Sequence, residues 1–399
     1  MAQFVSHFAM RRADSVLYRC SVGAQTLWRH QMTFSRRSFI KTTMGAIALP
    51  SLTPIASVFA HNHSPEWKTY EVVTELSLAD AANQATQGWI PLPLIADTNY
   101  FKTVSIKTET SARTSIVKST SGQAQMIWAE WNEGSADRTI KVTTTISTRE
   151  RNTKFGKPDA ALKLSKEELA FWTKGTDLLP TDGIVRQRAL EITKSLPKNA
   201  SDIDKAKAIY NWVVENTFRN PKTRGCGVGD VKMMLETNNL GGKCADLNAV
   251  YVALTRAAGV PARDVYGIRV ADSSRGYKSL GKGGDISKAQ HCRAEFFAKG
   301  HGWIAVDPAD VRKVILEESG GLPINDPKVV AIRDYLFGNW EMNWMAYNYD
   351  HDLLLPGSQL GDAGKIGYLM YPQAEIKGNR VDSLDPDNFK YKITSKLIA

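Results

Sequence analysis

The segment with the strongest chemical signature is Gly-Gly-Lys-Cys at residues 241–244, which runs directly into a helical pattern over Ala245 to Ala258. A cysteine in the first turn of a helix lies at the positive end of the helix dipole, beside backbone N–H groups that have no partner. Both features favour the thiolate over the thiol. We therefore predict that Cys244 is a nucleophile and that its backbone N–H donates to an oxyanion.

Two further residues complete the chemistry that a thiolate needs. His291 stands at the head of a strand-like run, and Asp307 stands at the end of the next one. The runs 291–297 and 303–306 are predicted to pair through a glycine-containing turn, which brings His291 and Asp307 opposite one another within a couple of residues. An imidazole oriented by a carboxylate carries the thiol proton to a leaving amine. The order Cys, His, Asp thus predicts acyl transfer on amide or peptide bonds.

Each of these residues also has an ordinary structural explanation. Cys244 taken alone is a small buried hydrophobic residue, His291 a core histidine, and Asp307 a turn former ahead of proline. Their joint occurrence at the boundaries of the predicted elements favours catalysis. A second oxyanion donor cannot be assigned from spacing, and a side chain near Asn239 is a candidate. His301 falls in the predicted turn and is expected to be a solvated loop residue.

Cys226 and Cys292 are the other cysteines beyond the first sixty residues. If Cys244 stays free for chemistry, these two are available for a disulfide in an oxidising compartment, a pairing that the sequence leaves open. The alternative is a metal site that also uses Cys244 and His291. Structural zinc sites usually show paired ligands a few residues apart, and positions 291 and 292 point to opposite faces of a strand. We expect neither a metal nor a cofactor.

The order of the predicted elements indicates two kinds of structure in succession. Residues 67–149 read as strands, because apolar and polar residues alternate in segments separated by turns, and a small β-sandwich is expected. Ser165 with Glu168, and Ser201 with Asp202, mark the starts of helices. The predicted organisation is a leader at 1–60, a β-rich domain at 61–150, a linker with helices at 151–200, and a catalytic domain with a C-terminal extension at 201–399.

The leader accounts for most of the positive charge. The chain has a net charge of +10, but the first sixty residues hold seven Lys or Arg and one acid, which leaves +4 for the rest. That charge is too small and too scattered to predict a nucleic-acid partner. Residues 35–41 read Ser-Arg-Arg-Ser-Phe-Ile-Lys, similar to a twin-arginine export signal, and an apolar stretch and small residues follow. We expect recognition by the twin-arginine machinery, removal of the leader, and a periplasmic or otherwise extracytoplasmic location without stable membrane insertion. Residues 1–31 read as a mis-called start.

Five separate blocks of the sequence resemble the transglutaminase-like superfamily. They are Ala206–Val214, Gly241–Asn248, Arg256–Arg263, His291–Phe297 and Gly302–Pro308, and they occur in that family's order. The resemblance implies an α+β, papain-like core in which the cysteine helix packs on an antiparallel sheet, preceded here by the small β-sandwich. It also implies a catalytic triad of Cys244, His291 and Asp307. A peptide, protein or cell-wall peptide is expected as the substrate, and the cell-wall peptide or periplasmic protein is suggested by location only. Calcium dependence is not expected, because no carboxylate cluster suggests a calcium site.

One position departs from the pattern of that family. Arg293 stands where bacterial relatives often carry tryptophan. If that ring normally shapes the acyl pocket, a preference for a polar or acidic substrate group follows. Because the superfamily includes transamidating enzymes, peptidases, amidases and inactive members, the resemblance implies the chemistry more closely than the substrate. Hydrolysis is the leading expectation. Transamidation and a non-catalytic binding module are the alternatives.

Overall fold

The computed structural model describes residues 66–81, 84–93, 97–385 and 389–399. The predicted leader, with its twin-arginine segment, lies outside these residues. Within the described part of the chain, no helix has both the length and the apolar character needed to cross a bilayer.

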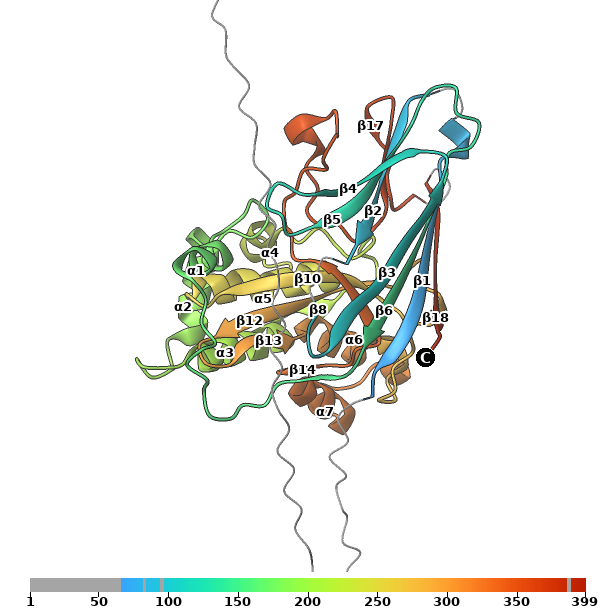
Figure 1. Ribbon diagram of the computed structural model, residues 1–399. Coiled ribbons are helices and arrows are strands. Elements are labelled where there is room, and N and C mark those ends of the chain that lie inside the picture. The colour runs from blue at the N-terminus through green and yellow to red at the C-terminus, as the bar shows by residue number, and fades with distance from the viewer. Residues whose placement is uncertain (1–65, 82–83, 94–96, 386–388) are drawn as a thin grey trace, which may run out of the picture. The chain divides into compact units, whose positions relative to one another are not determined.

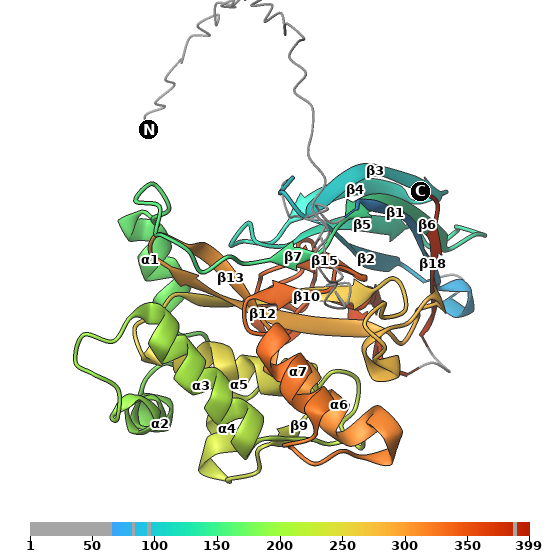
Figure 2. The ribbon, with the colours of Figure 1, turned by 90° about the horizontal axis from the view of Figure 1, so that it is seen from below.

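A four-stranded antiparallel sheet forms the central layer, with the strand order β13-β12-β10-β15. These strands span Gly302–Val306 (β13), Gln290–Ala298 (β12), Ala262–Arg269 (β10) and Trp344–Asn348 (β15). Helices cover one face of this sheet, and most of the other β-strands lie on the opposite side (Figure 2). The helices are α1 (Lys166–Thr173), α2 (Gly183–Thr193), α3 (Asp202–Asn216), α4 (Val231–Glu236), α5 (Cys244–Ala257), α6 (Pro308–Glu317) and α7 (Pro327–Tyr335). Short 3₁₀ turns are η1 (Ala79–Ala81), η2 (Lys278–Leu280), η3 (Glu318–Gly320) and η4 (Gly361–Gly364).

Helix α5 is the centre of the helical layer. Every residue from Cys244 to Arg256 is buried, which is expected of a helix enclosed on all sides. Its apolar residues pack with those of α2, α3 and α6 and with Cys292, Ala294 and Phe296 from one face of β12. The predicted helix over Ala245 to Ala258 is confirmed to within one residue at each end.

Two five-stranded sheets form the β-rich region, in the orders β11-β18-β1-β6-β3 and β17-β16-β2-β5-β4 (Figure 1). The first contains β11 (Gly284–Asp285), β18 (Lys390–Leu397), β1 (Lys68–Ser77), β6 (Thr139–Thr148) and β3 (Phe101–Thr110). The second contains β17 (Asn379–Arg380), β16 (Gln373–Ile376), β2 (Thr86–Leu92), β5 (Gln125–Trp131) and β4 (Arg113–Lys118). One buried cluster joins residues of both sheets, so they pack face to face as a sandwich. Two short pairs remain: β7 (Arg151–Asn152) with β14 (Asn339–Trp340), and β8 (Phe218–Arg219) with β9 (Gly241–Gly242).

The C-terminal strands belong to this sandwich. Strand β18 pairs with β1 through Tyr70 and Leu397, and β16 pairs with β2 through Trp89 and Gln373. The sandwich therefore combines the N-terminal strands with the end of the chain. Arg151 directly follows the predicted domain boundary at position 150. It is buried and forms an ion pair with Glu295 of the central sheet.

Candidate active site

Cys244 is the first residue of α5, as the sequence predicted, and exposes only 4% of its surface. Asp246 holds the start of this helix together, since its carboxylate accepts hydrogen bonds from the backbone N–H groups of Lys243, Val228 and Gly229 at 2.9, 3.0 and 2.9 Å. A Cβ atom at Gly227 would lie 1.9 Å from the Asp246 carboxylate. Only glycine at position 227 therefore lets this loop pack against the start of the helix that carries the cysteine.

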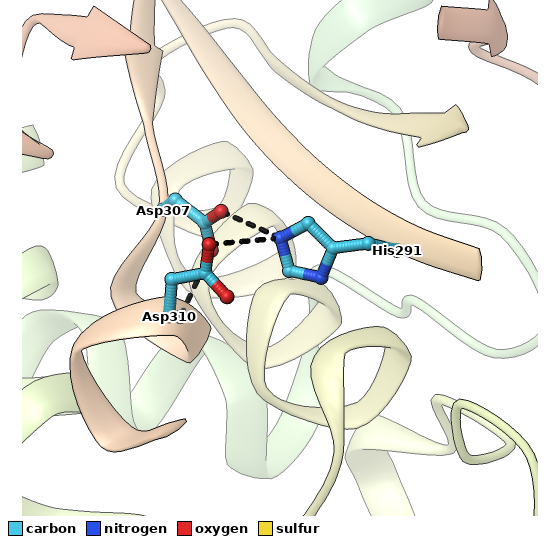
Figure 3. Close-up of side chains that lie close together, drawn as sticks. All are labelled: His291, Asp307 and Asp310. Atoms are coloured by element: carbon cyan, nitrogen blue, oxygen red, sulfur yellow. Dashed lines mark hydrogen bonds and ion pairs between the residues drawn. The ribbon is translucent and has the colours of Figure 1, made fainter. Parts of the chain in front are cut away.

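His291 and Asp307 meet at the ends of their strands. The pairing of β12 with β13 aligns Ala294 with Val306, which places the following Asp307 near His291. The Nε2 atom of His291 lies 2.8 Å from Oδ2 of Asp307, and both side chains are buried. Figure 3 shows the other ring nitrogen pointing away from the carboxylates. The sequence prediction that these two side chains fall together is confirmed, and Nδ1 is the nitrogen left for the thiol.

A second carboxylate, Asp310 of α6, also contacts the histidine. Its Oδ2 lies 3.3 Å from His291 Nε2 (Figure 3). Arg269 at the end of β10 donates to both oxygens of Asp310, at 2.6 and 2.9 Å. The Asp310 backbone N–H donates to Asp307 Oδ1 at 3.1 Å, as expected where Asp307 is the N-cap of α6. His291 therefore faces two linked carboxylates.

These charges determine the proton on the imidazole. Burial and the Arg269 guanidinium lower the pKa of His291, but the carboxylates of Asp310 and Asp307 outweigh them and raise it from 6.5 to about 9. Burial raises the pKa of Asp310, yet Arg269 and His291 hold it well below its usual value. Burial and the neighbouring Asp310 raise the pKa of Asp307. His291 is thus an imidazolium at neutral pH.

Three cysteines gather at the start of α5, and all are free thiols. The backbone N–H of Ala245 donates to the carbonyl of Cys226 at 2.9 Å, and the Cys226 sulfur lies 3.4 Å from the carbonyl oxygen of Gln290. Cys226 thus lies between α5 and the start of β12. On the other side, the Asn248 amide donates to the carbonyl of Cys292 at 2.8 Å. The disulfide left open by the sequence is not formed.

The neighbouring groups favour a thiolate at Cys244. Hydrogen bonds from the thiols of Cys226 and Cys292 contribute most, and the hydrogen bond and charge of His291 add to them. Together they outweigh burial and hold the pKa of Cys244 well below its ordinary value. The pKa of Cys226 is raised by its hydrogen bond to Cys244, and the pKa of Cys292 is raised by burial. Of these three thiols, Cys244 is the one whose pKa is lowered.

Two tyrosines from the segment before β16 close over this group. The Tyr371 hydroxyl lies 3.1 Å from the Cys226 sulfur, to which it donates. The Tyr368 hydroxyl donates to the carbonyl of Gly227 at 2.6 Å, and its ring stacks on that of Tyr266. This segment and the glycine-rich loop therefore limit the exposure of Cys244.

Arg293 is buried behind the histidine. Its Nη1 donates to the carbonyl of Glu341 at 2.9 Å, and its Nε lies 3.6 Å from Asp307 Oδ2. The guanidinium carbon lies 4.8 Å from the centre of the Trp344 ring. Because this charge is directed at Asp307, it gives no support to the expectation that Arg293 selects an acidic substrate.

Other residues singled out in the sequence lie elsewhere. His301 contacts the carbonyl of Gly156 at 3.3 Å in the predicted turn. Asn239, near which the sequence placed a candidate second oxyanion donor, is exposed in the loop before β9. The Ala245 N–H is already bonded to Cys226, so the predicted oxyanion donor remains the N–H of Cys244.

His291, Asp307 and Asp310 have ligand atoms that all lie within 4.8 Å of one another, a spacing that would suit a cation. The two acids already have positive partners, because Arg269 binds Asp310 with two hydrogen bonds and the Arg293 guanidinium lies next to Asp307. A metal ion would have to compete with these guanidinium groups. The donor set therefore fits an internal ion network better than a metal centre.

Comparison with known proteins shows which family this chain belongs to. The family model of the transglutaminase-like superfamily matches residues 186–308, which include Cys244, His291 and Asp307. An uncharacterized protein of Haemophilus influenzae is 34% identical over 355 residues, covering 84% of this chain and 94% of that protein. The chain belongs to the transglutaminase-like superfamily. Membership in this superfamily supports cysteine-based catalysis in general.

Solved structures of two proteins were also matched by this transglutaminase-like chain. One is a presumed cysteine protease from Cytophaga hutchinsonii, with 14% identity, coverage of 84% of this chain and 92% of that one, and a TM-score of 0.49. The other is the periplasmic domain of TgpA from Pseudomonas aeruginosa, with 14% identity, coverage of 64% and 93%, and a TM-score of 0.32.

Sequence reasoning did not find Asp310, Arg269 or the tyrosines. Asp310 is in the first turn of α6, where an acid is common for reasons of helix stability, so its type and position carry no catalytic signal. The one available clue was its spacing of three residues from Asp307, which matches the spacing between an N-cap and N3. Its pairing with Arg269 depends on how β10 lies next to β12, and the local pattern does not contain that information.

Proposed function

We propose that this protein is a thiol hydrolase that cleaves amide or peptide bonds of an extracytoplasmic substrate through a thioester acyl-enzyme. The observation that carries the proposal is the grouping of a low-pKa thiol at the start of α5 with an imidazole held 2.8 Å from a buried carboxylate. This arrangement supplies a nucleophile, a proton donor and an orienting group, which are the three parts that attack on a carboxamide requires.

The proposed reaction uses these groups in sequence. The Cys244 thiolate attacks the carbonyl carbon, and the backbone N–H of Cys244 stabilises the developing oxyanion. The His291 imidazolium gives its proton to the amine as the C–N bond breaks, which leaves a thioester and a neutral imidazole. The imidazole then takes a proton from water, whose oxygen attacks the thioester. The sulfur then leaves as the thiolate while the proton stays on His291, so the carboxylic acid is released and the ion pair is restored.

The acceptor and the location are inferred from less specific features. Water is the proposed acceptor because it is abundant, and transamidation with a primary amine is the alternative. The twin-arginine motif supports recognition by that export machinery and a periplasmic or otherwise extracytoplasmic location. A peptide, protein or cell-wall peptide is the proposed substrate. No nucleic acid, metal, cofactor or stable membrane insertion enters the proposal.

The test compares wild-type protein with Cys244→Ala and Cys244→Ser on a panel of peptide amides, with and without primary amines. Turnover by the wild type and its loss in both variants are expected. Product analysis separates hydrolysis, which releases the acid, from transamidation, which yields the substituted amide. Full turnover in Cys244→Ala would refute the proposal.

A non-catalytic binding module is the second candidate, because Cys244 exposes only 4% of its surface. Alkylation by iodoacetamide as a function of pH distinguishes the two candidates. A reactive thiolate is alkylated well below the ordinary thiol pKa of about 8.5, whereas an inert buried thiol is not. The matched control is Cys244→Ser, in which any remaining label must lie on another cysteine.

A further inference from the structure

In the proposed mechanism, two of the three thiols form and break no bonds with the substrate. Cys226 and Cys292 both contribute hydrogen bonds to Cys244, and both are buried beside it. Such a group has a second chemistry besides acyl transfer, because a reactive thiolate next to a thiol forms a disulfide when it is oxidised.

We propose that Cys226 is the resolving cysteine of Cys244, so that a peroxide converts this pair reversibly into a disulfide. The geometry of the backbone supports the choice of pair. The Ala245 N–H to Cys226 carbonyl bond of 2.9 Å ties the two segments together. Standard bond lengths then keep the Cα atoms of Cys226 and Cys244 within about 8 Å. A disulfide needs about 4.4–6.8 Å, so at most a small loop movement is required.

The backbone holds the two neighbouring cysteines at different points along α5. The Cys226 carbonyl accepts from the N–H of Ala245, the residue directly after Cys244. The Cys292 carbonyl is bonded to Asn248, one turn further along the helix, and Cys292 is paired with Tyr266 of β10 in the middle of the sheet. Because its backbone is bonded next to the nucleophile, Cys226 is the partner assigned to the Cys244 sulfur.

The proposed chemistry proceeds in two balanced steps. The Cys244 thiolate attacks one peroxide oxygen and the O–O bond breaks. The sulfur is oxidised to a sulfenic acid, and hydroxide leaves and takes up a proton to become water. The Cys226 thiol then attacks that sulfur, the S–O bond breaks, and the departing hydroxide takes the Cys226 proton as a second water. Overall, two thiols and one hydrogen peroxide give one disulfide and two waters, and a dithiol reductant reverses the change.

The consequence for activity rests on the proposed function, whereas formation of the bond does not. A disulfide at Cys244 removes the nucleophile without damaging it. Oxidation without a resolving partner instead proceeds to the sulfinic and sulfonic acids, which thiol reductants do not restore. Cys226 is therefore assigned the role of protecting the nucleophile during exposure to peroxide.

The test treats the reduced full chain with hydrogen peroxide, alkylates the remaining thiols and maps the peptides by mass spectrometry. In the wild type we expect a linked peptide that joins Cys226 to Cys244, and recovery of Cys244 labelling after dithiothreitol. In Cys226→Ser we expect no such link and at least about tenfold more irreversibly oxidised Cys244. Cys292→Ser is the matched control, and it should form the same disulfide as the wild type.

Several outcomes would overturn the inference. These are a link from Cys244 to Cys292, no link at all in the wild type, or full dithiothreitol recovery in Cys226→Ser. The wild-type map is decisive even if a variant fails to fold. Because the map needs no substrate, a protein that forms the disulfide but turns over no amide refutes the proposed function alone, and the reverse result refutes this inference alone.

Discussion

Replacing Asp310 with Asn should lower the pKa of His291 and move the alkaline limit of activity to lower pH. The wild-type shift from 6.5 to about 9 corresponds to roughly 3 kcal/mol in favour of the imidazolium. Two carboxylates at 2.8 and 3.3 Å produce this shift against burial and the Arg269 charge. Removing one of them leaves the opposing contributions in place, so we expect the pKa of His291 to fall by at least about one unit, or about 1.4 kcal/mol.

The assay is an NMR titration of the His291 ring, assigned with a His291→Gln variant, together with the pH profile of kcat/KM. The neutral amide at position 310 also leaves Arg269 without its partner, and that alone can destabilise the fold. Glu295→Gln is therefore the matched control. Glu295 lies on the same strand as His291, and its loss leaves Arg151 and Arg263 without their acid. An Asp310→Asn titration that matches the wild type, or an equal shift in Glu295→Gln, would refute the reasoning.

Three other predictions follow from the same geometry. Asp307→Asn should lower kcat roughly 10³–10⁴-fold with little change in KM, and steady-state kinetics on a folded variant would contradict the orienting role if the loss were under about tenfold. The raised pKa of His291 stabilises the fold fully below 6.5, the pKa of histidine in the unfolded chain, and this stabilisation is lost as pH rises through about 9. In urea unfolding of Cys244→Ala, the free energy of unfolding should therefore fall by up to about 3 kcal/mol over that range. A double variant that also carries His291→Gln should not show this fall. Gly227→Ala should cost roughly 2 kcal/mol or more and slow alkylation of Cys244, since its Cβ meets the carboxylate that holds the helix start. Gly276→Ala, with φ +83° and no described atom within 4 Å, should cost only about 1 kcal/mol in thermal melts.

Local patterns predicted the elements that carry the reactive residues. The start of α5 was recognisable from Gly-Gly-Lys-Cys, because glycine tolerates close approach and apolar residues at helical spacing follow. The structure gives the reason in detail, since a Cβ at Gly242 would lie 2.4 Å from the Asp246 side chain. The register of β12 with β13 was predictable because a short turn between two alternating runs leaves few ways to pair them.

Such local patterns could not predict contacts between residues that are far apart in the sequence. Alternation in residues 390–397 indicates a strand but not its neighbour, and the pairing of Tyr70 with Leu397 links opposite ends of the chain. The same holds for Arg269 and Asp310. Each side chain is ordinary in its own element, and they form an ion pair only because the sheet places the end of β10 beside the start of α6.

The buried charges explain why the site needs more than three residues. In the proposed resting state, Arg269, Arg293 and the His291 imidazolium supply three positive charges, and the two aspartates with the Cys244 thiolate supply three negative ones. Acylation consumes one charge of each sign, since the thiolate becomes a thioester as the imidazolium loses its proton. The cluster thus stays electrically balanced through the proposed reaction, which avoids the large cost of an unpaired buried charge. Asp310 favours the charged form of the histidine while Arg269 keeps Asp310 ionised. The second carboxylate therefore adjusts the proton affinity of His291 without leaving an uncompensated charge in the protein interior.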